Sequence, residues 1–296
     1  MQVHHKLLII IYPLIYLKNR LMEFFYPQLK NQIRVLLYHD IPPDKYEYFS
    51  FQLSEIKKQW NFISPDEFTS HMSGKTPLKG KNLLLTFDDG FISNKLVAES
   101  ILKSFGIKAI FFVLPNFINI SNSSLARKYV ADYIYPSMNI EEVPINWINM
   151  NWDDLQELIR AGHTIGAHTM SHTKLSTIID VGELQKEIAE SAEILEQKLG
   201  IPIRHFAFPF GNIESFSPEA LKVAKGHFGL IYSGLRGKNI PTVSKYAIRR
   251  DSVTPKDHPF LIASFLNGAA DFQYSRSVNI LDSWANTNAE FRPKTN

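Results

Sequence analysis

The sequence predicts an α/β protein built on a parallel sheet. Short apolar runs recur along the chain of 296 residues, and each is followed by a stretch with helical periodicity. Most runs are continuous rather than alternating, which is typical of strands buried on both faces. This alternation indicates either a doubly wound sheet or a barrel, and about seven strand–helix units favour the barrel. The predicted strands are 34–38, 82–87, 108–114, 164–167, 204–208, 229–232 and 246–248.

The stretches between these runs have the apolar spacing of helices. The clearest covers 182–199, where Asp180 is placed to cap the first turn and Gly200 follows the last. The other predicted helices are 51–60, 92–105, 152–161, 218–225 and 258–266.

Three segments fall outside the repeating pattern. The segment 116–151 is rich in Asn, Ser and Ile, and we interpret it as a long insertion above the barrel. Residues 1–30 form an apolar N-terminal segment, and 31–272 form the body of the protein. The polar C-terminal tail, 273–296, is expected to wrap the surface or to fray.

Composition excludes several classes of protein. The formal net charge is only +3 and the chain has no long run of Lys and Arg, so a nucleic-acid partner is not expected. The absence of cysteine excludes disulfides, Cys-zinc sites, iron–sulfur clusters and thiol nucleophiles. It does not fix the compartment, because a chain without thiols folds in reducing or oxidising surroundings.

The N-terminal segment contains an apolar run at 7–17 that allows three interpretations. A membrane span needs about 20 apolar residues, and Pro13 interrupts this shorter run. A signal peptide would end in small residues, whereas Lys18 and Arg20 follow. We favour contact with a membrane surface, with a helix packed on the protein or an atypical signal as the alternatives.

Asp88 and Asp89 close the apolar run 82–87 and are followed by Gly90. Two adjacent carboxylates at the end of a buried strand repel each other unless a cation lies beside them. A metal ion would bind one carboxylate and leave the other free as a base. The alternative is an ordinary turn, because Asp-Asp-Gly is good turn chemistry.

His168 and His172 follow the run 164–167. Two histidines four residues apart converge if the segment forms a helical turn, as two imidazole ligands of one metal require. Thr169, Ser171 or backbone carbonyls are expected to bond their other ring nitrogens. The alternative is a pair of core or capping histidines.

A third cluster lies at 206–211, where Pro209 and Gly211 force an irregular turn around Phe210. Such a turn can direct a backbone N–H into a site, although it can also simply end a strand. All three clusters follow predicted parallel strands, and active sites of barrels gather on that face.

The motifs TFDDG, HTxxH and FAFPFG occur in this order, and with them the chain resembles the NodB-type polysaccharide deacetylases (carbohydrate esterase family 4) over 33–272. The resemblance implies a distorted (β/α)7 barrel that binds one divalent metal, usually zinc, and removes acetyl groups from N-acetylated sugars. By position it implies that Asp88 is the general base. It makes Asp89, His168 and His172 the metal ligands. Phe210 stands where the family usually has tyrosine, and its backbone N–H is the expected donor to the oxyanion.

The chain departs from the family pattern at several positions. The third motif commonly begins with an arginine that supports the base, and here that position is Ala207. Arg249 or Arg250 could supply the cation instead, and Arg249 is also a candidate substrate contact, with a surface ion pair as the alternative. No late Leu-x-His motif is found, so the acid is unassigned. His39, in a Leu-Tyr-His-Asp sequence that also resembles family members, is a candidate acid or substrate contact.

Trp147 is a candidate for stacking on a sugar ring, and packing within the insertion is the alternative. The sequence thus predicts a metal-dependent N-deacetylase acting on an amino-sugar glycan or a lipid-linked sugar in bacterial envelope synthesis. A membrane or cell-envelope location is favoured over the cytoplasm. The alternatives are a deformylase or esterase with the same metal site, and a catalytically silent carbohydrate-binding barrel.

Overall fold

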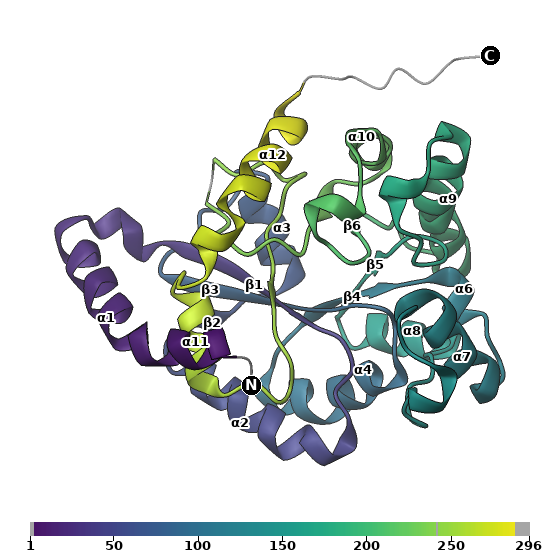
Figure 1. Cartoon of the computed structure of the whole chain (residues 1–296), viewed down its shortest axis with the longest axis horizontal. Coiled ribbons are helices and arrows are strands. Elements are labelled where there is room, and N and C mark those ends of the chain that lie inside the picture. Colours follow the sequence, from purple (N-terminus) through teal and green to yellow (C-terminus); the bar gives the residue numbers. More distant parts are fainter. Residues whose placement is uncertain (1–2, 241, 288–296) are drawn as a thin grey trace.

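The computed structural model is a curled parallel sheet surrounded by helices, and it describes residues 3–240 and 242–287 (Figure 1). Neighbouring strands run in the order β7-β6-β5-β4-β3-β1-β8, and β2 pairs separately with β3. Every pairing between these strands is parallel. The strands are β1 (Gln32–Tyr38), β2 (Asn61–Phe62), β3 (Lys81–Phe87), β4 (Ala109–Val113), β5 (Thr164–Ala167), β6 (His205–Ala207), β7 (Leu230–Tyr232) and β8 (Asp251–Ser252).

The stretch after β7 closes the curled sheet. Ile248 forms a parallel bridge with Tyr232 of β7, and β8, three residues later, pairs with Leu36 and Leu37 of β1. One short stretch therefore contacts both ends of the sheet, which confirms the distorted barrel. The predicted strand 246–248 is only this single bridge, because Ala247 donates its N–H to Ser244 within a turn.

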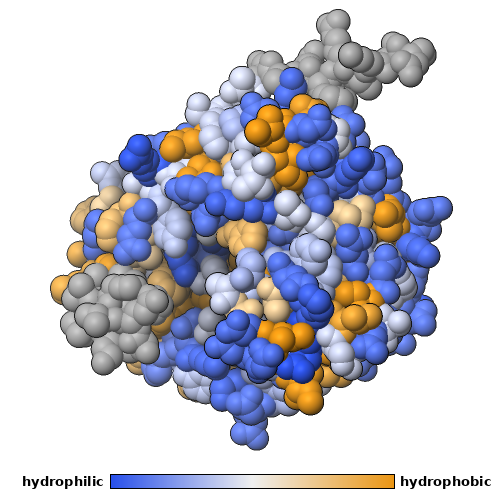
Figure 2. All heavy atoms as spheres, turned by 45° about the vertical axis from the view of Figure 1, so that its right-hand side comes forward, coloured by the Kyte–Doolittle hydropathy of each residue, from blue (hydrophilic) through white to orange (hydrophobic). Residues whose placement is uncertain are grey.

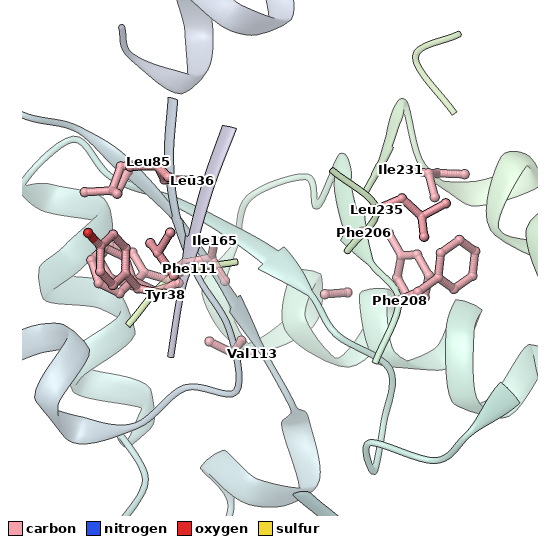
Figure 3. Close-up of a cluster of buried hydrophobic side chains, with 14 of the residues drawn as sticks. Leu36, Tyr38, Leu85, Phe111, Val113, Ile165, Phe206, Phe208, Ile231 and Leu235 are labelled. Atoms are coloured by element: carbon pink, nitrogen blue, oxygen red, sulfur yellow. The ribbon is translucent and has the colours of Figure 1, made fainter. Parts of the chain in front are cut away.

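The long strands β1, β3 and β4 are buried over almost their whole length, as their continuous apolar runs predict. Aromatic rings from all three stack inside the sheet: Tyr38 lies 5.9 Å from Phe87, which lies 5.1 Å from Phe111, centroid to centroid. Figure 3 shows Tyr38 and Phe111 in one part of this core and Phe206 and Phe208 in another.

Most helices lie where the apolar spacing predicts them. The Asp180 carboxylate accepts the Glu183 N–H at 2.9 Å, and Gly200 ends α9 in the left-handed conformation, as expected. The predicted helix 92–105 is one continuous stretch whose middle, Ala98–Leu102, is a π-helical turn. The α-helices are α1 (Val3–Phe25), α2 (Tyr46–Lys57), α3 (Pro65–Met72), α4 (Ile92–Val97), α5 (Lys103–Phe105), α6 (Pro115–Ile118), α7 (Ser123–Tyr129), α8 (Trp152–Arg160), α9 (Val181–Leu199), α10 (Pro218–His227), α11 (Pro259–Leu266) and α12 (Ser275–Asn286).

The chain after 272 is not simply a polar tail. Residues Ser275–Asn286 form α12, which buries Leu281 and Ala285, and its Trp284 contacts Phe216 edge-on. The four-residue spacing of Leu281 and Ala285 gives this helix a narrow apolar face despite its polar composition. The expected fraying of 288–296 lies outside the described residues.

The N-terminal segment forms the helix α1, and Pro13 lies inside this helix instead of ending it. Figure 1 shows α1 at one edge of the molecule beside α11. The Asn19 amide donates to the Asn267 carbonyl at 2.9 Å, and Ile15 packs against the main core. Of the helices in the described ranges, none has the length and apolar character needed to cross a bilayer.

The segment 116–151 carries its own small apolar cluster, which includes Phe117, Val130 and Ile134 and packs on Phe91. A π-helical turn, η4 (Val130–Ile134), continues α7 without a break. This turn brings the backbone of the insertion toward the ends of the strands, where it contributes to the site described next.

Candidate active site

The predicted clusters converge beyond the carboxyl ends of the strands. Asp88 and Asp89 directly follow β3, His168 directly follows β5, and Phe210 lies three residues after β6. Parallel strands end on the same rim of a barrel, so residues distant in the chain become neighbours there.

Three of these side chains form one buried group. The Asp89 Oδ1 atom lies 3.6 Å from His168 Nε2 and 3.5 Å from His172 Nε2. One ligand atom from each residue lies within 4.8 Å of the others, and all three side chains are buried. This is the set that the sequence predicts to bind a metal.

Both histidines are oriented by backbone carbonyls. His168 Nδ1 lies 2.7 Å from the Ala207 carbonyl, and His172 Nδ1 lies 3.0 Å from the Tyr133 carbonyl. Carbonyl oxygens only accept, so each Nδ1 carries the proton and each Nε2 presents a lone pair to Asp89. Of the expected partners, backbone carbonyls are therefore the ones used. The Tyr133 carbonyl comes from the η4 turn and has no signal in the sequence.

The backbone of the site is unusual. Positive φ angles at non-glycine residues occur, within the described ranges, at Asp89 (76°), Thr169 (69°), His172 (70°) and Phe210 (60°). Such angles cost free energy and concentrate where function requires them. The predicted helical turn between the two histidines is wrong, because residues 168–172 are irregular. The left-handed angles, and the Thr169 hydroxyl accepting the His172 N–H at 3.0 Å, bring the rings together instead.

The electrostatics of the group fit a divalent cation. Both carboxylate oxygens of Asp89 are buried without a hydrogen-bond partner among the described residues, and burial and Asp88 raise the pKa of Asp89 well above its usual value. Burial lowers the pKa of His168 to about 4 and that of His172 to about 3, so both are neutral at pH 7. Two neutral imidazoles and one uncompensated carboxylate are a donor set suited to zinc.

Asp88 lies beside this group with a partner of its own. Arg250 donates to both oxygens of Asp88, at 2.7 and 2.9 Å, and both side chains are buried. Burial raises the pKa of Asp88, but Arg250 and His168 outweigh it and lower that pKa below its usual value. A bidentate arginine therefore keeps Asp88 ionised as an available base.

Of the two arginines considered from the sequence, Arg250 is the one directed to Asp88. The neighbouring Arg249 donates to Asp282 at 2.6 Å and to the Lys238 carbonyl at 3.1 Å. The two neighbouring arginines therefore have different partners, and only Arg250 contacts Asp88. The structure does not bring Arg249 to the group formed by Asp88, Asp89 and the histidines.

Phe210 lies next to the site. Its ring lies 4.6 Å from the His172 ring, centroid to centroid, and is 45% exposed. Its N–H donates to no other group in the described part of the chain. A backbone N–H without a partner, in a residue that contacts His172, is a candidate donor to a developing oxyanion.

A cleft of about 290 Å³ has His39 on its wall. Burial lowers the pKa of His39, while Asp88 raises it and Arg250 lowers it further. The Trp147 indole donates to Asp40 at 2.7 Å and its ring lies 5.0 Å from that of Tyr135. The cleft is lined in part by His39, Asp40, Tyr135, Trp147, Val253 and Lys256.

The cleft therefore combines the end of β1, the insertion and the loop after β8. The sequence singles out His39 and Trp147 but not Asp40 or Tyr135. Asp40 is the residue after His39 in the Leu-Tyr-His-Asp sequence, and that proximity was the available signal.

Comparison with known proteins agrees with this geometry. A family model described as polysaccharide deacetylase matches residues 75–227, just over half of the chain. YxkH of Bacillus subtilis strain 168, provisionally named a polysaccharide deacetylase, is 21% identical over 231 residues, which cover 76% of this chain and 72% of YxkH.

Two solved structures share the fold. The deacetylase PplD of Streptococcus pyogenes, in complex with acetate, is 20% identical and has a TM-score of 0.63, covering 79% of this chain and 98% of PplD. A de-N-acetylase from Aggregatibacter actinomycetemcomitans is 18% identical with a TM-score of 0.62, covering 79% of this chain and 99% of that one.

Proposed function

We propose that this chain removes acetyl groups from an N-acetylated amino-sugar glycan with the help of a divalent metal. The chain belongs to the polysaccharide deacetylase family and is therefore a hydrolase of carbon–nitrogen bonds other than peptide bonds. One observation carries the proposal. The unpaired Asp89 carboxylate faces two neutral histidines, while the adjacent Asp88 is kept ionised by Arg250. A site that only bound sugar would have no use for a free base beside three ligand atoms.

Asp89, His168 and His172 would bind the metal, and zinc is the ion we propose. When bound, the ion supplies Lewis-acid polarisation of the acetyl carbonyl and acidifies water in the site.

The residues of the chain supply the proton transfers. Asp88 accepts the proton of the attacking water, because Arg250 keeps its carboxylate ionised and directed. The Phe210 N–H donates to the oxyanion that develops on the former carbonyl oxygen. His39, on the cleft wall, is the proposed proton donor to the leaving nitrogen. Burial lowers its pKa and the Asp88 charge opposes this, so His39 starts neutral and passes on the proton that Asp88 takes from the water.

The cleft indicates how the sugar is held. Trp147 and Tyr135 offer aromatic surface to a sugar ring, and Asp40 fixes the Trp147 indole. As part of the same proposal, we place the reaction in bacterial envelope polysaccharide synthesis, on a glycan or a lipid-linked sugar. The bacterial origin of the relatives above supports this setting.

Acetate release from a panel of N-acetylated oligosaccharides and lipid-linked sugars tests the proposal. We expect release by the purified chain, loss on treatment with chelator, and recovery on addition of zinc. Asp88→Asn should lower kcat/KM by about 10³-fold, within the range for loss of a general base. The exposed Asp153 on α8 provides the matched control, and Asp153→Asn should leave the rate unchanged.

Metal content measured on the same samples separates the parts of the proposal. Asp88→Asn should retain stoichiometric metal, whereas His168→Ala should lose it. Release that is insensitive to chelator would overturn metal dependence. If the chain binds zinc but releases acetate from none of the substrates, the proposed acyl group or the proposed substrate class is wrong.

A further inference from the structure

Four of the exposed apolar side chains of α1 form one stripe. Leu14, Leu17, Leu21 and Phe24 follow the spacing three, four, three, which places them on one face of a helix. They are 70%, 58%, 53% and 76% exposed, respectively. A helix on the surface of a globular protein normally turns such a stripe toward the core, whereas α1 turns it outward.

The opposite face of α1 fixes this orientation. Ile15 packs on the main core, and the Asn19 amide donates to the Asn267 carbonyl. Glu23 is only 4% exposed, accepts from Gln32 and pairs with Lys81 at 3.2 Å. A roll of the helix that buried the stripe would break these contacts and expose Glu23 instead.

The outward face of α1 is basic. Lys18 and Arg20 flank the stripe on its two sides, and both are exposed. The one acidic residue of α1, Glu23, is buried on the inner face, where it pairs with Lys81 at 3.2 Å. Arg20 reaches Glu23 only at 4.0 Å and its side chain stays 63% exposed. Beyond α1, the exposed Tyr26 and Lys30 continue the same mixture of apolar and basic groups.

We propose that α1 lies flat in the surface of an anionic lipid bilayer, with its leucine and phenylalanine stripe at the boundary between headgroups and acyl chains. An apolar face bordered by cations is the pattern of interfacial helices, and each basic residue is attracted to anionic lipid. This inference concerns α1 alone and does not depend on the proposed substrate.

A second copy of the chain fits the stripe less well. Pairing two stripes would bring Lys18 and Arg20 of one chain against the same cations of the other, with no outward acidic residue on α1 to compensate. The face shown in Figure 2, by contrast, is mostly hydrophilic, and its apolar side chains form small separate groups.

Co-sedimentation of the full chain with lipid vesicles tests the proposal. We expect binding to phosphatidylcholine vesicles that contain about one third phosphatidylglycerol, and weaker binding to pure phosphatidylcholine. The triple variant Leu17→Gln, Leu21→Gln, Phe24→Gln should lower the partition coefficient on the order of a hundredfold or more, because three large apolar side chains no longer insert. A matched triple variant, Leu125→Gln, Ile179→Gln, Phe272→Gln, removes equally exposed apolar groups elsewhere and should bind normally.

Charge variants test the second half of the proposal. Lys18→Gln with Arg20→Gln should weaken binding to anionic vesicles about 25-fold, at roughly fivefold per charge, and should leave binding to neutral vesicles unchanged. All substituted side chains are exposed, so circular dichroism and the thermal midpoint should match the parent chain.

Three results would overturn the inference. The first is no binding of the folded parent chain to anionic vesicles. The second is binding that the stripe variant retains. The third is a dimer in light scattering that the stripe variant converts to monomer, which would assign the stripe to a second copy of the chain.

Discussion

Two arginines, Arg34 and Arg250, are fully buried in this barrel, and their surroundings differ in one instructive respect. Arg34 donates to Asp251 and Asp271 and to the Phe265 carbonyl, at distances between 2.6 and 2.9 Å. Around it each carboxylate has a partner. The network joins β1 to β8 and to the chain after α11, and nothing in it is left for a ligand.

Arg250 binds Asp88 in the same bidentate manner, yet the next residue, Asp89, has no partner for either oxygen among the described residues. Buried charges are normally paired, so an isolated buried carboxylate indicates a group that another partner is meant to satisfy. The comparison therefore separates a structural ion network from a site, although burial and residue types are nearly the same in both.

The largest expected effect on folding comes from the Arg34 network. Arg34→Met leaves Asp271 without its cation and the buried Asp251 with only Arg236, at 3.5 Å. We expect the free energy of unfolding to fall by about 3–5 kcal/mol. Chemical denaturation monitored by circular dichroism measures this loss. Arg249→Met is the matched control, because its partner Asp282 is partly exposed, and it should cost about 1 kcal/mol or less. If both variants lost the same free energy of unfolding, the Arg34 network would contribute no more to stability than the partly exposed Arg249–Asp282 pair.

The next effect concerns the rate and its pH dependence. Arg250→Met should lower kcat/KM at pH 7 by about 10²-fold, because burial then raises the pKa of Asp88 and depopulates the base. The acid limb of the kcat/KM profile should move to higher pH. Arg250→Lys restores the charge without the two-point contact, so it should recover the position of that limb but not the full rate.

Arg250 acts through Asp88 and is a positioning residue, so the shape of the profile is the decisive readout. A loss of rate in Arg250→Met with an unmoved acid limb would show that Arg250 only stabilises the fold. It would then belong with Arg34, and the contrast between the two arginines would disappear.

The smallest effect extends the comparison to the histidines. His163 is buried at the start of β5, accepts the Ala109 N–H at 3.1 Å through Nδ1, and has a pKa lowered by burial to about 4. An unfolded histidine has a pKa of about 6.5, so the unfolded chain binds the proton first as pH falls. Stability should decrease between pH 6.5 and 4, by about 1.4 kcal/mol at pH 5.5.

His163→Asn keeps an acceptor near the Nδ1 position and should remove that part of the pH dependence. The measurement is the free energy of unfolding at pH 8 and pH 5.5 for both proteins. An identical difference in parent and variant would show that His163 is already protonated in the folded chain or does not titrate in this range.

The sequence indicates the chemistry of the site more fully than its geometry. Asp88, Asp89, His168 and His172 are recognisable because they follow buried strands, and parallel strands bring such residues to one rim. The partner of Asp88 is harder to predict from the sequence, because Arg249 and Arg250 are adjacent residues of the same type. Only the direction of the backbone at the end of the barrel selects Arg250.

Other features have little or no local signal. The Tyr133 carbonyl orients His172 because a π-helical turn in the insertion reaches the site, and π-helical turns follow no simple pattern of residues. The helix α12 has a weak signal, because Val278, Leu281 and Ala285 follow helical spacing, but it is obscured by their mostly polar neighbours.

By itself, the sequence determined the alternation of strands and helices, the order of the motifs and the residue types that would meet. The apolar periodicity and the residues that follow each apolar run are local properties of the chain. In a parallel sheet the residues that follow the strands then meet on one rim. The tertiary structure decided which arginine supports the base, how four left-handed residues shape the site, and that the apolar stripe of α1 faces outward. Each of these depends on contacts between segments far apart in the chain, whose free energies no single stretch of sequence contains.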